Sequence, residues 1–276
     1  MGFMKLVKGS WLTMRSLGVG VLFREFLRRV AGVGYSYRGI PIRSNNDFRI
    51  VRNLRLKYEV SRLGDVVAAS TGFGEFAVRL DDVSLLSTLL EPLEEMYAAD
   101  VKNKVVVDVG AYIGDTAIFY VSRGARRVYA FEPVEKHFRY LVDNIARNNA
   151  VDRVVTFNYG LWVEDGVLKV KYESLGTGLT VGDEVELKVR RIGDVLREIA
   201  ETEGGIDLVK MDCEGCEYAL LTTPCEIIRL ARQYIVEIHG APTPLIHHMS
   251  KCGYGAEFVH RVTNYVDVYR FTIGGY

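Results

Sequence analysis

The sequence predicts an α/β fold, in which a mostly parallel sheet carries helices on both faces and follows an N-terminal extension. Two observations predict it. From about residue 101, apolar strand-like segments alternate with helix-like segments, which is the pattern of parallel strands joined by right-handed crossovers. Glycines and charged residues gather where these strands end, and in open α/β sheets ligands bind at that edge.

Residues 1–100 form the predicted extension. Within it, residues 21–30, "VLFREFLRRV", have the spacing of an amphipathic helix with one apolar and one charged face. The remaining elements are a turn with short extended pieces at 32–43, a segment ambiguous between strand and helix at 48–63, and a strand followed by a helix interrupted near Pro92 at 76–100.

Residues 101–276 form the predicted main domain. Pro133 is suited to opening a helix, and Gly124 and Asn148 with Asn149 are suited to ending one. We expect strands at 104–110, 127–133, 154–162, 206–212 and 233–240, helices at 115–125, 134–150 and 193–201, an inserted hairpin at 166–174 and 184–192, and a closing antiparallel pair at 256–262 and 265–273.

The net charge of zero conceals an asymmetry between the two parts of the chain. Residues 1–57 carry 12 Lys and Arg against two acids, and the rest carries 23 against 33. A basic arm can meet nucleic acid, anionic lipid or the acidic body of its own chain. We expect a cytoplasmic protein with peripheral membrane contact through residues 1–31, because no apolar run is long enough for a transmembrane helix and no secretory signal is evident.

The four cysteines do not suggest a disulfide scaffold, because they are few and clustered near one another. The stretch "CEGC" at 213–216 has the spacing of a redox pair or of half a zinc site, but no second close pair follows. We therefore expect Cys213, Cys216, Cys225 and Cys252 to be small packing residues.

The first strand-to-helix loop, "VVVDVGAYIGD", indicates a nucleoside cofactor. Gly110 allows a tight turn, and Gly114 allows the next helix to begin close to a ligand. Glu132 ends the next strand, where it can accept hydrogen bonds from ribose hydroxyls. The spacing is not the G-x-G-x-x-G of dinucleotide sites, so S-adenosylmethionine fits better than NAD. Asp108 can orient the loop or bind the ammonium of the cofactor.

The stretch "KMDCEGCE" at 210–217 places charged residues at the end of a buried strand. Lys210, Asp212 and Glu214 alternate, so on an extended segment their side chains point to one side. They either neutralise one another as structure or line a site. Because the stretch lies at the ligand-binding edge, a site is favoured, and Lys210 with Asp212 can also form a structural ion pair.

These motifs, together with "FEP", "RIGDVL" and "YIVEIHG", resemble the FkbM family of S-adenosylmethionine-dependent methyltransferases over about half the chain. The resemblance implies a class I, Rossmann-like fold with seven strands, and O-methylation of a hydroxyl on a small molecule, sugar or glycan. It implies that Lys210, Asp212, Glu214 and Glu217 belong to the signature block. Residues implied to hold the cofactor are Asp108, Gly110, Ala111, Gly114, Glu132, Pro133 and Leu161.

Methyl transfer also needs a group that removes the hydroxyl proton. The candidate catalytic residues are Asp212, His239, Lys210 and Glu214, and His239 is either the base or a histidine bonded to Glu237 or to a backbone carbonyl. A divalent ion held by Asp212, Glu214 and Glu237 suits the oxygen ligands, but the sequence fixes no metal.

Two alternatives remain: an RNA 2′-O-methyltransferase whose basic arm binds phosphates, and a cofactor-binding protein without turnover. No aromatic-basic interleaving of a nucleic-acid module is evident, so nucleic acid is not the favoured partner. The sequence leaves the acceptor and the oligomeric state open.

Overall fold

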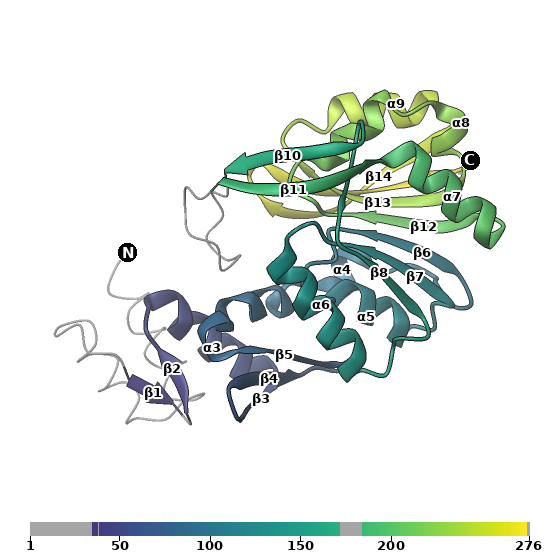
Figure 1. Cartoon of the computed structure of the whole chain (residues 1–276). Coiled ribbons are helices and arrows are strands. Elements are labelled where there is room, and N and C mark those ends of the chain that lie inside the picture. Colours follow the sequence, from purple (N-terminus) through teal and green to yellow (C-terminus); the bar gives the residue numbers. More distant parts are fainter. Residues whose placement is uncertain (1–34, 38, 172–183, 275–276) are drawn as a thin grey trace. The chain divides into compact units, whose positions relative to one another are not determined.

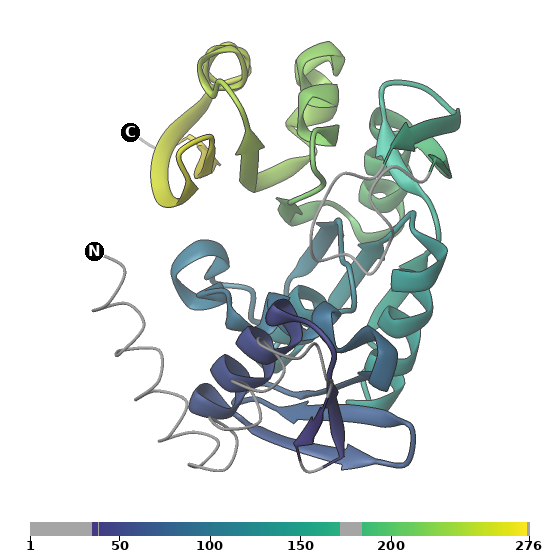
Figure 2. The ribbon, with the colours of Figure 1, turned by 90° about the vertical axis from the view of Figure 1, so that its left-hand side faces the viewer.

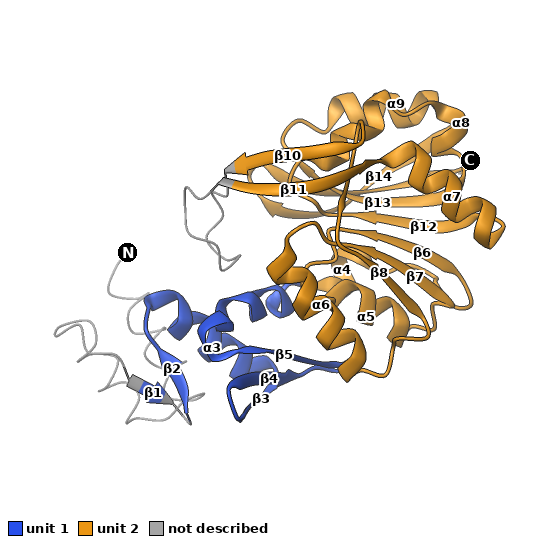
Figure 3. Cartoon of the chain, viewed as in Figure 1, with its two compact units in different colours: residues 1–91, 173–181 blue, residues 92–172, 182–276 orange. Residues whose placement is uncertain are grey.

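A computed structural model describes residues 35–37, 39–171 and 184–274 (Figure 1). The chain divides into two compact units, one ending at Glu91 and the other beginning at Pro92 (Figure 3). The unit boundary therefore precedes the domain boundary expected after residue 100, and the division into separate domains stays a prediction. The predicted helix at 21–30 and the proposed membrane contact of residues 1–31 lie outside the described residues. No helix in the described part is long and apolar enough to cross a membrane.

The first unit combines one long helix with small antiparallel sheets. Ser44 and Asp47 form a capping box, in which each side chain accepts a hydrogen bond from the other's backbone, and this fixes the start of α3. The segment that was ambiguous from sequence becomes both a helix and a strand. The elements are β1 (Tyr35–Tyr37), β2 (Ile40–Ile42), α3 (Asn45–Lys57), β3 (Glu59–Leu63), β4 (Val66–Ser70), β5 (Glu75–Arg79) and the 3₁₀ helix η1 (Leu80–Leu90).

The second unit is built on a seven-stranded sheet in the order β14-β15-β13-β12-β6-β7-β8. Only β15 runs antiparallel to its neighbours, so the predicted mostly parallel sheet and its closing antiparallel pair are confirmed. This is the seven-stranded class I methyltransferase architecture. The strands are β6 (Val105–Val109), β7 (Arg127–Phe131), β8 (Val154–Phe157), β12 (Ile206–Met211), β13 (Ala231–His239), β14 (Tyr254–Thr263) and β15 (Val266–Ile273).

Helices cover both faces of this sheet (Figures 1 and 2). One face carries α4 (Leu93–Tyr97), α5 (Asp115–Ser122) and α6 (Glu135–Arg147), and the other carries α7 (Ile192–Glu203), α8 (Cys225–Ile228) and α9 (Thr243–Lys251). The buried residues of α6 recur at helical spacing, and charged residues lie between them. One face of the helix therefore packs against the sheet and the other faces solvent.

The third predicted strand differs from the structure. The segment at 154–162 forms two strands, β8 and β9 (Gly160–Trp162), and β9 leaves the main sheet to pair with β11 (Glu184–Arg191). The predicted inserted hairpin is confirmed, since β10 (Gly166–Lys171) pairs antiparallel with β11. The polar sequence Asn158-Tyr159 interrupts the apolar run, and the chain changes sheets at this point.

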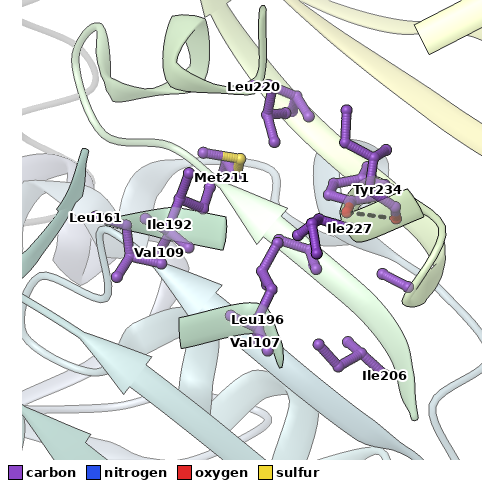
Figure 4. Packing of buried hydrophobic residues seen from close by; sticks show 14 of the residues in the cluster. Val107, Val109, Leu161, Ile192, Leu196, Ile206, Met211, Leu220, Ile227 and Tyr234 are labelled. Carbon is purple, nitrogen blue, oxygen red and sulfur yellow. Dashed lines mark hydrogen bonds between the residues drawn. The ribbon is translucent and has the colours of Figure 1, made fainter. Parts of the chain in front are cut away.

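The main core lies between the central strands and the helices α7, α8 and α9. Val107 and Val109 of β6 and Met211 of β12 belong to one buried cluster with Ile192 and Leu196 of α7 (Figure 4). The hydroxyl of the buried Tyr234 donates a hydrogen bond to the carbonyl of Ile228 at 2.8 Å. The polar atom of this side chain is therefore satisfied inside the core. Packing on both faces fixes the carboxyl ends of β6, β7, β12 and β13 at one edge.

Candidate active site

The loop after β6 has two unusual backbone conformations. Gly110 has φ +76° and Tyr112, which is not glycine, has φ +47°. A Cβ on Gly110 would lie 1.8 Å from the carbonyl oxygen of Asp212, so only glycine lets the loop pass this close to the end of β12. Gly114 then caps the start of α5 with φ +94°. The loop is therefore shaped by contact with the "KMDCEGCE" segment as well as by its own turn.

Glu132 holds this loop from the neighbouring strand. Its Oε2 accepts a hydrogen bond from the backbone N–H of Tyr112 at 3.0 Å, and its Oε1 accepts one from Val134 at 2.8 Å. The carboxylate is almost fully buried. Each of its oxygens has a second lone pair, so the predicted role in binding ribose hydroxyls remains compatible with these contacts and stays a prediction.

Asp108 and Lys210 form an ion pair inside the sheet. The Lys210 Nζ lies 3.1 Å from Asp108 Oδ1 and donates to the carbonyl of Gly110 at 2.9 Å. Asp108 Oδ2 accepts from the hydroxyl of Thr116 at 2.7 Å. Burial raises the pKa of Asp108. Burial by itself would lower the pKa of Lys210, but the charges of Asp108 and Asp212 outweigh it and raise that pKa.

This pairing corrects the expectation that Lys210 pairs with Asp212, and it bears on the two roles expected of Asp108. The ion-pair partner of Lys210 is Asp108 on the adjacent strand, not Asp212 two residues further on, because Lys210 and Asp108 are paired positions of β12 and β6. Asp108 is fully buried. Its geometry therefore favours orientation of the loop over contact with the ammonium of a cofactor.

Asp212 and Glu214 do not continue the alternation of the strand. β12 ends at Met211, and Glu214 takes a left-handed conformation with φ +55°. Glu214 is consequently exposed, whereas Asp212 is half-buried. The expectation that Lys210, Asp212 and Glu214 share one side of an extended segment was wrong at Glu214, because the strand ends before it.

A cluster of ionisable side chains lies where β12 and β13 end. Asp212, Glu237 and His239 each bring one ligand-type atom to within 4.8 Å of the others. Tyr97 of α4 donates its hydroxyl to Glu237 Oε2 at 2.7 Å and lies 3.2 Å from Asp212 Oδ2. We call Asp212, Glu237 and His239 the edge cluster.

His239 is surrounded by carboxylates. Its Nδ1 lies 3.3 Å from Oε1 of Glu217, and its Nε2 lies 3.5 Å from Glu214 and 3.5 Å from Glu237. Burial would lower the pKa of His239, but the contact with Glu217 and the charges of Glu214 and Asp212 raise it to about 9. Burial, followed by the charge of Asp212, raises the pKa of Glu237 to about 7.

The cysteines were interpreted wrongly as packing residues. Cys213 is bonded to Cys216, and Cys225 to Cys252. The "CEGC" stretch therefore contains a disulfide, which agrees with the redox-pair spacing noted in the sequence. The second bridge joins α8 to the end of α9, two elements that the sequence separates and the fold brings together.

The remaining predicted cofactor residues occupy different surroundings. Ala111 is buried in the loop after β6, and Pro133 packs against Gly160. Leu161 is the central residue of β9 and is buried in the core. Tyr97 was missed, because the sequence before residue 101 showed no recognisable motif. The position of Glu217, bonded to the backbone N–H of His239 at 2.9 Å, could not be read from its place in the signature block.

Residues 108–256 match the family model described as "Methyltransferase FkbM domain". The chain is 30% identical over 163 residues to a hexuronic acid methyltransferase, AglP, of Haloferax volcanii, which covers 58% of this chain and 63% of that protein. It is 28% identical over 171 residues to the methyltransferase sdnD of Sordaria araneosa, which covers 49% of this chain and 66% of that protein.

This chain thus spans a little under two thirds of the length of each of those relatives. Among solved structures, the METTL16 MTase domain is 14% identical with a TM-score of 0.42, covering 66% of this chain and 65% of that one. The fold assignment rests instead on the strand order of the sheet described above.

Proposed function

The chain belongs to the FkbM family of S-adenosylmethionine-dependent methyltransferases, and from this premise we propose that it transfers a methyl group to a hydroxyl of a sugar acid or of a glycan that contains one. The sugar acid as acceptor is suggested by the resemblance to the hexuronic acid methyltransferase of Haloferax volcanii. Transfer to a hydroxyl follows the sequence analysis and is part of the proposal.

One observation carries the proposal: the loop after β6 and the segment after β12 are bonded to each other. Asp212 donates its backbone N–H to the carbonyl of Val109 at 3.1 Å, and Lys210 Nζ donates to the carbonyl of Gly110 at 2.9 Å. A cofactor bound against the loop therefore lies beside Asp212. A methyl donor and an acceptor group must meet at such a junction.

The two sides of the junction have different tasks. On the cofactor side, Gly110, Ala111 and Gly114 provide backbone close to the ligand, and Glu132 accepts hydrogen bonds from the ribose. Pro133 shapes the turn after Glu132, and Leu161 supports this side from the core. Lys210 and Asp108 act inside the protein by fixing the loop.

The acceptor side supplies charged groups. In the transfer, the acceptor oxygen attacks the methyl carbon, the carbon–sulfur bond breaks with its electrons on sulfur, and the product is S-adenosylhomocysteine. The hydroxyl proton passes to a carboxylate at this edge, Asp212 or the exposed Glu214. Burial would lower the pKa of His239, but the contact with Glu217 and the charges of Glu214 and Asp212 raise it to about 9, so we assign the proton to a carboxylate and give His239 a role in orienting the acceptor.

The test is methyl transfer by the full chain, with labelled S-adenosylmethionine and a panel of glucuronic acid, galacturonic acid, the matching neutral sugars and a short RNA. We expect transfer to the sugar acids, with the new methyl on an ether oxygen by NMR. Asp212→Asn should fold, bind S-adenosylhomocysteine, and lose at least about 100-fold in turnover, the low end for removing a positioned base.

Lys104→Met provides the control. Lys104 pairs with Asp100 at the surface and directly precedes β6, at the opposite end of this strand from the candidate site. It should keep normal turnover. Methyl transfer by Asp212→Asn at the rate of the unmodified protein would remove Asp212 from the proposal. A methyl ester as product would replace the hydroxyl with a carboxylate as acceptor, and transfer to RNA alone would replace the sugar acid.

A further inference from the structure

We propose that the edge cluster of Asp212, Glu237 and His239 binds one divalent cation of the Mg²⁺ and Mn²⁺ class, and that this cation holds the acid group of the acceptor. The inference rests on the proposed function for the identity of the acceptor. The binding of the cation itself rests on the geometry of the cluster alone.

The three residues come from the ends of two adjacent strands. Asp212 follows β12, and Glu237 and His239 are alternate residues at the end of β13, so their side chains point to the same side. Their ligand atoms lie within 4.8 Å of one another. Because ligands about 2.1 Å from an ion lie about 3–4 Å apart, small side-chain rotations bring the three atoms onto one cation.

The second line of evidence is how other residues hold these ligands. Metal-binding histidines nearly always direct their second ring nitrogen at a carboxylate or carbonyl. Here the fully buried Glu217 takes Nδ1 of His239 at 3.3 Å, which leaves Nε2 near Glu237 Oε1 and Glu214 Oε2, each at 3.5 Å. Tyr97 takes the other oxygen of Glu237, Oε2, at 2.7 Å. Two of the three ligands are thus oriented with one atom directed at the same place.

The charge around the cluster also calls for a cation. The carboxylates of Asp212, Glu214, Glu217 and Glu237 surround the single imidazole of His239. The nearby Lys210 is committed to Asp108. An acceptor with its own carboxylate is repelled by such a site, whereas a bound divalent cation lowers the negative charge and offers a positive centre that the carboxylate of the acceptor can bind directly. Oxygen-rich sites with few nitrogens favour Mg²⁺ and Mn²⁺ over softer metals.

The cation assigns a class of substrate to the site. Three protein ligands leave positions on a six-coordinate ion for the acceptor and water. A carboxylate with a neighbouring hydroxyl can occupy two of these positions, whereas a neutral sugar offers only weakly binding hydroxyls. We therefore infer that the enzyme selects acceptors in which the methylated hydroxyl lies close to a carboxylate.

The experiment titrates Mn²⁺ into the chelator-treated full chain with S-adenosylhomocysteine present, followed by the EPR signal of free Mn²⁺ and by calorimetry. We expect one Mn²⁺ per chain, displaced by excess Mg²⁺. Asp212→Asn and His239→Gln should abolish binding. Glu217→Gln should weaken it about 10–100-fold, as is usual when the residue that orients a ligating histidine is changed.

The matched control is His260→Gln, because His260 also lies near a carboxylate, 3.7 Å from Glu95, but outside the edge cluster. It should bind Mn²⁺ as the unmodified protein does. Binding of S-adenosylhomocysteine by every variant shows that each is folded. If Glu217→Gln does not fold, Asp212→Asn, whose side chain is only half-buried, still decides the matter.

The two proposals fail separately. If the unmodified protein binds no Mn²⁺, or if Asp212→Asn binds it equally well, the cation site is wrong, and methyl transfer in the presence of EDTA leaves the proposed function standing. If Mn²⁺ binds as expected but no sugar acid is methylated, the proposed function is wrong and the cation site stands.

Discussion

Lys210 and Asp108 form a buried ion pair with 3.1 Å between Nζ and Oδ1, and they occupy facing positions of the two central strands. Both side chains are almost completely removed from solvent. The pair joins β12 to β6. β12 is followed by Asp212 of the edge cluster, and β6 is followed by the loop that is proposed to hold the cofactor. One ion pair thus fixes both sides of the proposed reaction site.

We predict that Lys210→Met destabilises the fold by about 3–5 kcal/mol, because it leaves the carboxylate of Asp108 buried without its counter-charge. Urea unfolding measures this difference. The double variant Lys210→Met with Asp108→Leu should recover part of the loss, because no buried charge then remains. The control Lys104→Met should cost about 0–1 kcal/mol, since Lys104 and Asp100 form an exposed pair. A loss no larger in Lys210→Met than in this control contradicts the structural role.

A second prediction concerns Gly110, where the loop after β6 passes close to the end of β12. Gly110 and Gly204 have nearly the same left-handed conformation, with φ +76° and +79°. A Cβ on Gly204 meets nothing within 4 Å, whereas one on Gly110 lies 1.8 Å from the backbone of Asp212. Gly204→Ala should therefore cost only the conformational term, about 1–2 kcal/mol.

Gly110→Ala should cost clearly more than Gly204→Ala and should also reduce binding of S-adenosylhomocysteine, because the loop and the end of β12 must separate. Thermal unfolding and calorimetry on both variants test this. Equal stability of the two variants would show that the close approach of Gly110 to Asp212 is not needed.

The sequence predicted the five parallel strands of the main sheet, the helices α5, α6 and α7 and the closing antiparallel pair, because these elements carried their own periodicity and end signals. The helices α8 and α9 were not predicted. The sequence could not identify which strands are neighbours. The pairing of β12 with β6 decides that Lys210 meets Asp108, and local spacing suggested Asp212 instead. The change of sheet between β8 and β9 was missed for a related reason, because a continuous apolar run does not show where its partner strand changes.

The same limit applies to the site. Asp212 and His239 could be proposed from the ends of their strands, but the contacts that orient His239 and Glu237 come from Glu217 and Tyr97. Tyr97 belongs to a helix whose sequence has no motif. The disulfides were missed because cysteine spacing does not reveal which elements the fold brings together.

The two disulfides close loops of very different length, with a sequence separation of 27 for Cys225 and Cys252 and of 3 for Cys213 and Cys216. A bridge that closes a longer loop restricts the unfolded chain more. We predict that replacing Cys225 and Cys252 by alanine costs roughly 3–4 kcal/mol, and that replacing Cys213 and Cys216 costs about half of that. Urea unfolding of the two double variants measures the difference.

Mass spectrometry of the unreduced protein after proteolysis should show both bridges. Free thiols at all four positions, or equal stability of both double variants and the unmodified protein, would contradict the bonded structure.

Glu203 gives a prediction of pH dependence. It lies at the end of α7, where its Oε1 accepts the hydroxyl of Tyr129 at 2.7 Å and its Oε2 pairs with Arg126 at 2.8 Å. Burial would raise the pKa of Glu203, but the bonds to Tyr129 and Arg126 outweigh it, and the pKa is lower than the ordinary value of 4.5. Folding therefore favours the charged form.

A carboxyl group whose pKa is lower in the folded state stabilises the fold above its unfolded pKa, and this contribution is lost as the pH falls through its folded pKa. Glu203→Gln should therefore lower the free energy of unfolding at pH 7, and its difference from the unmodified protein should shrink as the pH falls below 4.5. Glu201→Gln, an exposed change in the same helix, is the control and should show no such trend. A difference that grows toward acid pH would contradict the assigned contacts.

Glu132 provides the sharpest test of the cofactor site. Both of its oxygens already accept backbone N–H groups of the surrounding loops, so alanine at this position would disturb the loop as well as any ligand. Glutamine keeps one carbonyl oxygen and the shape of the side chain. Glu132→Gln should remain folded, although its amide –NH2 cannot accept one of the two backbone N–H groups, and it loses the negative charge that favours hydrogen bonds from ribose hydroxyls.

We predict that Glu132→Gln weakens binding of S-adenosylhomocysteine by about 1.5–3 kcal/mol, the usual worth of hydrogen bonds to a charged group. Calorimetry measures the affinity, and thermal unfolding without ligand checks the fold. Glu135→Gln is the matched control, because Glu135 lies in the first turn of α6 and forms an exposed ion pair with Arg139. Its affinity should be unchanged. If Glu132→Gln binds the ligand as tightly as Glu135→Gln, the contacts of Glu132 with Tyr112 and Val134 are its whole role, and the ribose must be bound elsewhere.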